Sequence, residues 1–147
     1  TYLWSKVEHD SDYRALARAI WAQRFHRPPP GGVEAARANA QTQIERAAVA
    51  VAQLRARQVP VVFLRTPSNG EYLAFEERAF PRTATWDALL HATAAPGIHF
   101  QDDAKLRGGE LPDGSHLSRR SAQQFTRQVA PQVEALWRDA APRRQTK

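Results

Sequence analysis

The sequence predicts a protein of the α/β class, in which helices pack on a short parallel sheet. Residues 59–65 give the clearest strand signal, because they are almost all apolar and often β-branched, as in a strand buried on both faces. A long helical segment, 33–57, precedes this strand across a short connection, which is the order of an αβ unit in a parallel sheet. A second short strand is expected at 98–100, after the turn at Pro96-Gly97.

Helices are expected before the first strand. Residues 1–8 are short and rich in aromatic and apolar side chains, as if they continued from an earlier element. The next helix begins at a cap, Asp10 or Ser11, and ends near Arg27, before the Pro-Gly connector at 28–32. Its apolar positions share one face at helical spacing: Tyr13, Leu16, Ala17, Ile20 and Trp21.

The helix predicted at 33–57 carries a narrow apolar stripe. The stripe follows three- and four-residue spacing through Ala40, Ile44, Ala47, Val51 and Leu54. Such a stripe suits either a coiled coil or a helix that covers a sheet. The strand that follows directly favours the sheet.

Three more helices are expected after the first strand. Ser68-Asn-Gly-Glu71 matches a capping box that opens a short helix, and Pro81-Arg82 ends it. The next helix spans 83–93. The last helix is capped by Ser118, and Pro131 should bend it or restart it. Its buried face is predicted to consist of Ala122, Phe125, Val129, Val133 and Leu136.

Two strands cannot form a parallel sheet with a proper core, so we expect further strands from outside these 147 residues. They would come from a missing N-terminal half or from a partner chain. The start at Thr1 and the absence of Met also indicate a partial chain. We therefore interpret residues 1–140 as one partial domain and residues 141–147 as a polar tail.

Composition narrows the class of protein. The formal net charge is +6, but the arginines are spread along helices without a basic, aromatic-rich stripe, which argues against a nucleic-acid partner. No apolar run approaches the roughly 18 residues that a membrane span requires. The chain has no cysteine, so thiol catalysis, disulfides and Cys-based zinc sites are excluded.

The strongest candidate for chemistry is the pair Asp113 and His116, spaced as Asp-x-x-His before the last helix. A carboxylate three residues before a histidine can hold one ring nitrogen and leave the other as a base, which is two thirds of a hydrolytic triad. In the structural alternative, Asp113 starts a turn and His116 packs on the last helix. Ser115 and Ser118 are close in sequence but are poor nucleophile candidates, and Ser118 is better explained as a cap.

Other candidates carry weaker signals. Arg65 ends the first strand, at the edge where open α/β sheets bind ligands, so it either contacts substrate or pairs with Glu71 or a helix C-terminus. His99 is interpreted as a core or loop histidine. With Asp102-Asp103 it matches no metal-ligand spacing, so we expect neither a metal nor a cofactor. Both Trp86 and Trp137 are expected to be core anchors.

The order of these elements resembles the latter half of an SGNH (GDSL-type) hydrolase or acyltransferase domain. The resemblance covers about residues 33–137, and it rests on the segments Val61–Pro67, Phe80–Arg82, Trp86–Leu90, Ile98–Phe100 and Leu111–Phe125. It implies a flavodoxin-like three-layer α/β/α fold. It also implies that Asp113 and His116 form the family's last block, in which His116 is the general base.

The same resemblance implies a function that this chain cannot perform alone. The family's Gly-Asp-Ser-like nucleophile block and its Gly and Asn oxyanion donors are absent, and they would precede Thr1. The expected activity is a serine esterase or O-acyltransferase acting on an acetyl ester, of a carbohydrate by resemblance, in a bacterial cell envelope or periplasm. The alternative is a non-catalytic module, either a helical interaction module or a glycan-binding domain.

Overall fold

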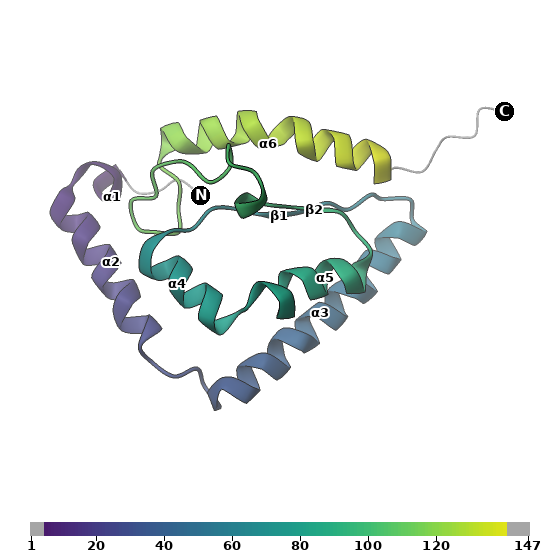
Figure 1. Ribbon diagram of the computed structural model, residues 1–147, viewed down its shortest axis with the longest axis horizontal. Helices are drawn as coiled ribbons and strands as arrows, with labels where there is room; N and C mark the ends of the chain where they lie inside the picture. The colour runs from purple at the N-terminus through teal and green to yellow at the C-terminus, as the bar shows by residue number, and fades with distance from the viewer. Residues whose placement is uncertain (1–4, 141–147) are drawn as a thin grey trace.

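The computed structural model describes residues 5–140, in which helices surround a small parallel sheet (Figure 1). The elements in chain order are α1 (Ser5–His9), α2 (Ser11–Phe25), α3 (Gly32–Ala56), β1 (Phe63–Arg65), α4 (Gly70–Ala79), the 3-10 turn η1 (Arg82–Ala84), α5 (Trp86–Thr93), β2 (Gly97–His99), the 3-10 turn η2 (Phe100–Asp102) and α6 (Arg119–Ala140). The predicted combination of many helices with a short parallel sheet is thus present. The predictions for residues 1–4 and for the tail at 141–147 lie outside the described residues.

The two strands pair in parallel, with Leu64 opposite Ile98 and Arg65 opposite His99. The strand predicted at 59–65 is shorter than expected, since only Phe63–Arg65 joins the ladder. Its predicted burial on both faces is wrong. Leu64 is 40% exposed, although its partner Ile98 in β2 lies in the core beneath α6.

The second strand lies one residue earlier than predicted, at Gly97–His99, and Phe100 already begins η2. Gly97 allows α5 to approach the sheet closely. A Cβ at this position would lie 2.7 Å from a ring carbon of Trp86 and 2.8 Å from a methyl carbon of Leu90. The glycine of the predicted turn therefore serves as a packing position beneath α5.

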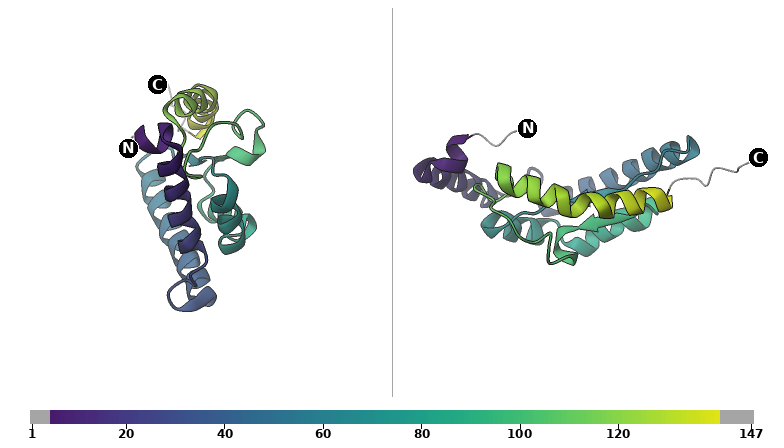
Figure 2. Two further views of the ribbon diagram at one scale, coloured as in Figure 1. Left: turned by 90° about the vertical axis from the view of Figure 1, so that its left-hand side faces the viewer. Right: turned by 90° about the horizontal axis from the view of Figure 1, so that it is seen from above.

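Helix α6 covers one face of the sheet, and α4 and α5 lie on the opposite face (Figure 1). The core between α6 and β2 consists of Ile98, Phe100, Leu106, Phe125 and Val129. This agrees with the predicted buried face of the last helix. Pro131 does not restart α6, which continues through it to Ala140. Figure 2 shows α6 lying over the sheet and the α1–α2 hairpin at one end of the molecule.

Helix α3 packs beside α5, and its side chains Ile44 and Val51 are buried as the stripe predicted. Between α3, the α4–α5 segment and the sheet lies an open cavity of about 670 Å³. Its walls include Ile44, Phe63 and Trp86. The α3 stripe therefore faces the sheet, but the space between them is incompletely filled.

Two local predictions on the middle helices are wrong. Ser68 does not form a capping box with Glu71. The N-cap of α4 is Asn69, without a side-chain cap bond, and the Ser68 hydroxyl instead donates to Glu76 Oε2 at 2.6 Å. The helix predicted at 83–93 is split into η1 and α5, with Thr85 between them.

Several apolar side chains are more exposed than their patterns suggested. Asp10 caps α2 as expected, accepting from the N–H groups of Asp12 and Tyr13 at 3.0 Å. The apolar face of α2, however, is not buried, because Leu16 and Ile20 face solvent. Trp137 is half exposed and is not a core anchor.

No helix between residues 5 and 140 has the length and apolar character needed to cross a membrane.

Replacing Leu106 with Ala tests this description of the core. The side chain has no exposed surface, so we expect its truncation to lower the free energy of unfolding by about 2–5 kcal/mol. The matched control is Leu16→Ala, which removes the same atoms from an exposed site and should change stability by less than about 0.5 kcal/mol. Urea denaturation followed by circular dichroism measures both. Equal losses in the two variants would contradict the assignment.

Candidate active site

The loops that follow the two strands meet at the carboxyl edge of the sheet. The loop after β1 ends at Asn69, whose backbone N–H donates to the Gly114 carbonyl at 2.9 Å. Gly114 belongs to the long segment between η2 and α6, which carries the predicted pair Asp113 and His116. In open α/β sheets this edge is where ligands bind.

The structure brings Asp113 and His116 into direct contact. Asp113 Oδ2 lies 2.8 Å from His116 Nδ1, and Asp113 Oδ1 accepts from the backbone N–H groups of Ser115 at 2.9 Å and His116 at 2.8 Å. An ionised carboxylate only accepts hydrogen bonds, so Nδ1 is the ring nitrogen that donates to it, and in the neutral ring Nε2 is the acceptor. The His116 side chain is 56% exposed, and its Nε2 has no hydrogen-bond partner among residues 5–140. The pair is therefore an oriented base open to solvent.

The charge of Asp113 is maintained by its hydrogen bonds. Burial favours the neutral acid, because the Asp113 side chain is only 9% exposed. Against this, the N–H groups of Ser115 and His116 and the His116 ring stabilise the carboxylate, and together they hold the pKa of Asp113 below its usual range. Asp113 is therefore ionised at neutral pH, as a residue that orients an imidazole must be.

Asp113 and His116 form a dyad, and residues 113–116 are called the dyad turn. Gly114 lets the dyad turn lie close to the loop after β1. Its φ of +89° lies in the left-handed region that favours glycine. An added Cβ would also lie 3.3 Å from both the Asn69 carbonyl oxygen and the Cβ of Tyr72. The Asp-Gly-Ser-His sequence thus requires glycine at position 114 for its backbone conformation, in addition to the Asp113 carboxylate and the His116 imidazole.

Neither nearby serine is placed as a nucleophile. The Ser115 hydroxyl lies 2.9 Å from His116 Nδ1 and 3.4 Å from Asp113 Oδ1, so it meets the nitrogen that the carboxylate already holds. The Ser118 hydroxyl is buried, accepts from the N–H of Ser121 at 3.4 Å and donates to its side chain at 3.1 Å. The prediction that Ser118 caps the last helix is confirmed.

Arg65 lies at the carboxyl end of β1, in an ion pair with Glu76 at 2.6 Å rather than with Glu71. Its guanidinium also donates to the Ser68 hydroxyl at 3.1 Å and to the Thr66 carbonyl at 2.6 Å. Arg65 lines the cavity beneath α3, and no bond joins it to the dyad in the described residues. The structure therefore places this predicted site residue beside the dyad region without bringing the two together.

The histidine predicted to lie either in the core or in a loop lies in the core. His99 is buried, packs against the rings of Trp86 and Phe100, and accepts from the Gln101 N–H through Nδ1 at 3.2 Å. Burial, reinforced by the positive charge of Arg82, lowers the pKa of His99. Asp102 is engaged by Arg82 in two bonds of 2.6 and 2.9 Å. Within the described residues, no group of three or more His, Asp and Glu side chains could hold a metal.

Sequence reasoning missed the residues that support the dyad turn from outside. Arg18 on α2 donates to the carbonyls of Leu111 and Pro112, and Asn69 binds Gly114 through its backbone. These contacts join segments far apart in the chain and use backbone atoms of the loop. A single sequence carries no signal for bonds of this kind, because any residue could supply the carbonyl.

Comparison of the chain with protein-family models, with curated proteins and with solved structures finds no match.

Replacing Asp113 with Asn tests the electrostatic role of the carboxylate. At pH 7 we expect a loss of about 1–3 kcal/mol of stability, because the amide has no charge and offers one acceptor oxygen where both oxygens of Asp113 are engaged. The folded pKa of Asp113 is below its ordinary value of 3.8. Its contribution is therefore full above that value and is lost as the pH falls through the folded pKa.

The measurement is urea unfolding of both proteins between pH 7 and pH 3. The difference in unfolding free energy should shrink toward the acid end of this range. A difference that stays constant from pH 7 to pH 3 would show that the charge of Asp113 does not stabilise the turn.

Proposed function

We propose that this chain is the C-terminal part of an SGNH-type serine esterase or O-acyltransferase, with Asp113 and His116 as its acid/base dyad. One observation carries the proposal. Asp113 holds His116 through Nδ1 at 2.8 Å, while Nε2 stands open at the carboxyl edge of a parallel sheet. This is the arrangement that a serine hydrolase needs on the base side of its triad.

The dyad would act in two half-reactions. In the first, Nε2 of His116 takes the proton of a serine hydroxyl as that oxygen attacks the ester carbonyl, and then delivers the proton to the departing alcohol. In the second, Nε2 takes a proton from water or from an acceptor hydroxyl as that oxygen attacks the acyl-serine carbonyl, and then returns the proton to the departing serine oxygen. Asp113 stabilises the imidazolium that forms in each step. Water as acceptor gives an esterase, and a sugar hydroxyl gives a transferase.

The serine would come from a segment that completes the sheet, either the N-terminal half of the domain or a partner chain. One edge of β1 carries no strand in the described part of the chain, and Leu64 beside it is exposed. A parallel strand added at this edge would place its inward side chains over the cavity beneath α3. Its carboxyl end would lie at the same edge as His116.

The proposed substrate is an acetyl ester carried by a carbohydrate. This class is suggested by the resemblance to envelope proteins of the SGNH type. Arg65 is proposed as a substrate contact, because it ends β1 at the ligand edge and its side chain is 28% exposed. Glu76 would then orient the guanidinium. The same resemblance suggests a location in the bacterial cell envelope.

A helical interaction module is the competing proposal, and the exposure of Leu16 and Ile20 on α2 favours it. Two neighbouring apolar side chains on one helix face suit contact with another protein. In this case the Asp113–His116 pair would be a structural turn. The two proposals differ in what they require of His116 Nε2.

The deciding experiment replaces His116 with Ala in the protein that contains the serine-bearing segment. If the dyad is catalytic, hydrolysis of p-nitrophenyl acetate should fall about a thousandfold or more, because loss of one triad member removes most of the chemistry. His91→Ala is the matched control, since His91 is an exposed histidine on α5. Wild-type hydrolysis in His116→Ala would reject the enzyme and favour the interaction module.

A further inference from the structure

The segment that carries the dyad is bound from outside by the α1–α2 hairpin. Arg18 on α2 donates through Nε to the Pro112 carbonyl at 2.8 Å and through Nη2 to the Leu111 carbonyl at 3.3 Å. These two carbonyls belong to the residues directly before Asp113. Arg18 therefore contacts the chain at the point where it enters the dyad turn.

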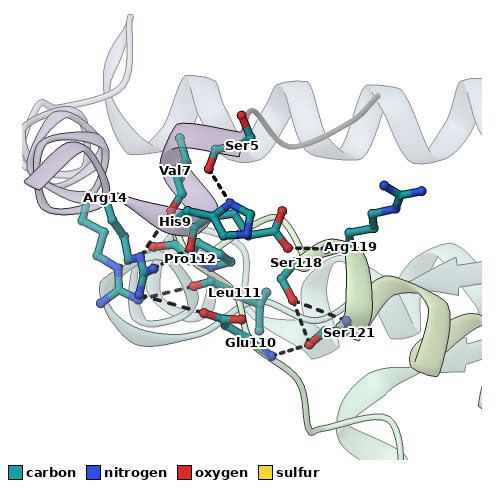
Figure 3. A network of polar contacts seen from close by, with 12 residues as sticks. Ser5, Val7, His9, Arg14, Glu110, Leu111, Pro112, Ser118, Arg119 and Ser121 are labelled. Atoms are coloured by element: carbon teal, nitrogen blue, oxygen red, sulfur yellow. Dashed lines mark hydrogen bonds and ion pairs between the residues drawn. The ribbon is translucent and has the colours of Figure 1, made fainter. Parts of the chain in front are cut away.

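The hairpin also contacts the chain where it leaves the turn. The Glu8 carboxylate accepts from the backbone N–H of Arg119 at 2.8 Å, at the start of α6. Arg14 lies 3.9 Å from Glu110 (Figure 3). It also joins α2 to α1 by donating to the carbonyls of Val7 and Glu8, at 3.2 and 2.6 Å. Helices α1 and α2 thus contact the chain on both sides of the turn.

The bonds within the dyad do not fix its place in the molecule. Those bonds join Asp113 to Ser115 and His116, so they orient the ring relative to the carboxylate only. The position of the turn relative to the sheet depends on bonds to other elements. Among them are the Asn69–Gly114 bond to the loop after β1, the bond from the Glu110 N–H to the Ser121 hydroxyl of α6, and the two bonds from Arg18. A guanidinium suits this task, because its donors have a fixed planar geometry that a lysine lacks.

We propose that Arg18 is a positioning residue of the dyad, which sets the place of Asp113 and thereby of the His116 ring through the carbonyls of Leu111 and Pro112. Arg18 makes no bond to the Asp113 carboxylate or to the His116 ring, so it acts through the loop backbone. The catalytic meaning of this role rests on the proposed function. The geometric claim does not, since it concerns this chain alone.

The first test measures the hydrogen exchange of backbone N–H groups in the chain of 147 residues by ¹⁵N NMR. In the unaltered chain, the Asn69 N–H should exchange slowly, because it donates to the Gly114 carbonyl and so joins the turn to the loop after β1. In Arg18→Gln and in Arg18→Lys, we expect this exchange to accelerate about tenfold or more, since a turn that has lost the bonds of Arg18 moves away from this partner. Arg24→Gln is the control, because Arg24 is on the same helix, packs over the Trp21 ring and does not contact the loop.

A second N–H group provides an internal measure of folding in the same spectra. The Gln101 N–H donates to His99 Nδ1 in the core, so its exchange should remain slow wherever the core is intact. Faster exchange at Asn69 with Gln101 unaltered supports the proposal. The proposal is overturned if exchange at Asn69 is unchanged in Arg18→Gln, or if Asn69 and Gln101 exchange faster together, which would make Arg18 a general folding residue.

The second test uses the protein that contains the serine-bearing segment. Arg18→Gln should lower kcat for ester hydrolysis by about ten- to a hundredfold with little change in KM, because a displaced base weakens chemistry rather than binding. Arg24→Gln should retain full activity. An unchanged kcat in Arg18→Gln overturns the role in catalysis. Full activity in His116→Ala would instead reject the proposed function, and the NMR result would still decide whether Arg18 positions the turn.

Discussion

The parallel pairing of β1 with β2, with Arg65 opposite His99, brings the carboxyl ends of both strands to one edge of the sheet. The loops that leave these ends are therefore neighbours, and the bond from Asn69 to Gly114 joins them. The dyad turn stands where it does because of this pairing. A ladder of three residue pairs thus determines where the Asp113–His116 turn lies, although this turn begins fourteen residues after the end of β2.

Those parts of the fold were predictable that depend only on residues close together in the sequence. Asp10 and Ser118 cap their helices as predicted, because a cap depends on a few adjacent residues. The strand at 59–65 was overestimated, since its apolar composition reports the burial of a complete sheet and the described chain supplies only one neighbour. Trp137 was misjudged for a related reason, because an aromatic residue on a helix does not show which face its neighbours cover.

The dyad itself was predictable from its spacing, but its support was not. Asp113 and His116 are three residues apart, so their contact is a local event that a pattern can reveal. Arg18 reaches the same turn from 93 and 94 residues away and binds backbone oxygens that every residue possesses. Long-range bonds to main-chain atoms produce no pattern in composition or periodicity. The contact of Arg18 with this turn could therefore not be predicted from one sequence.

The open edge of β1 also selects what can bind to it. An unpaired strand edge is a template for indiscriminate aggregation when it is long and flat. Here it is three residues long, it lies between Pro60 and Pro67, and it ends on the charged Arg65. Backbone pairing alone therefore offers little to an arriving strand, because proline has no N–H to donate. A strand that paired here would have to gain most of its binding energy from side chains packed against the cavity walls, so its shape would count for more than its backbone hydrogen bonds.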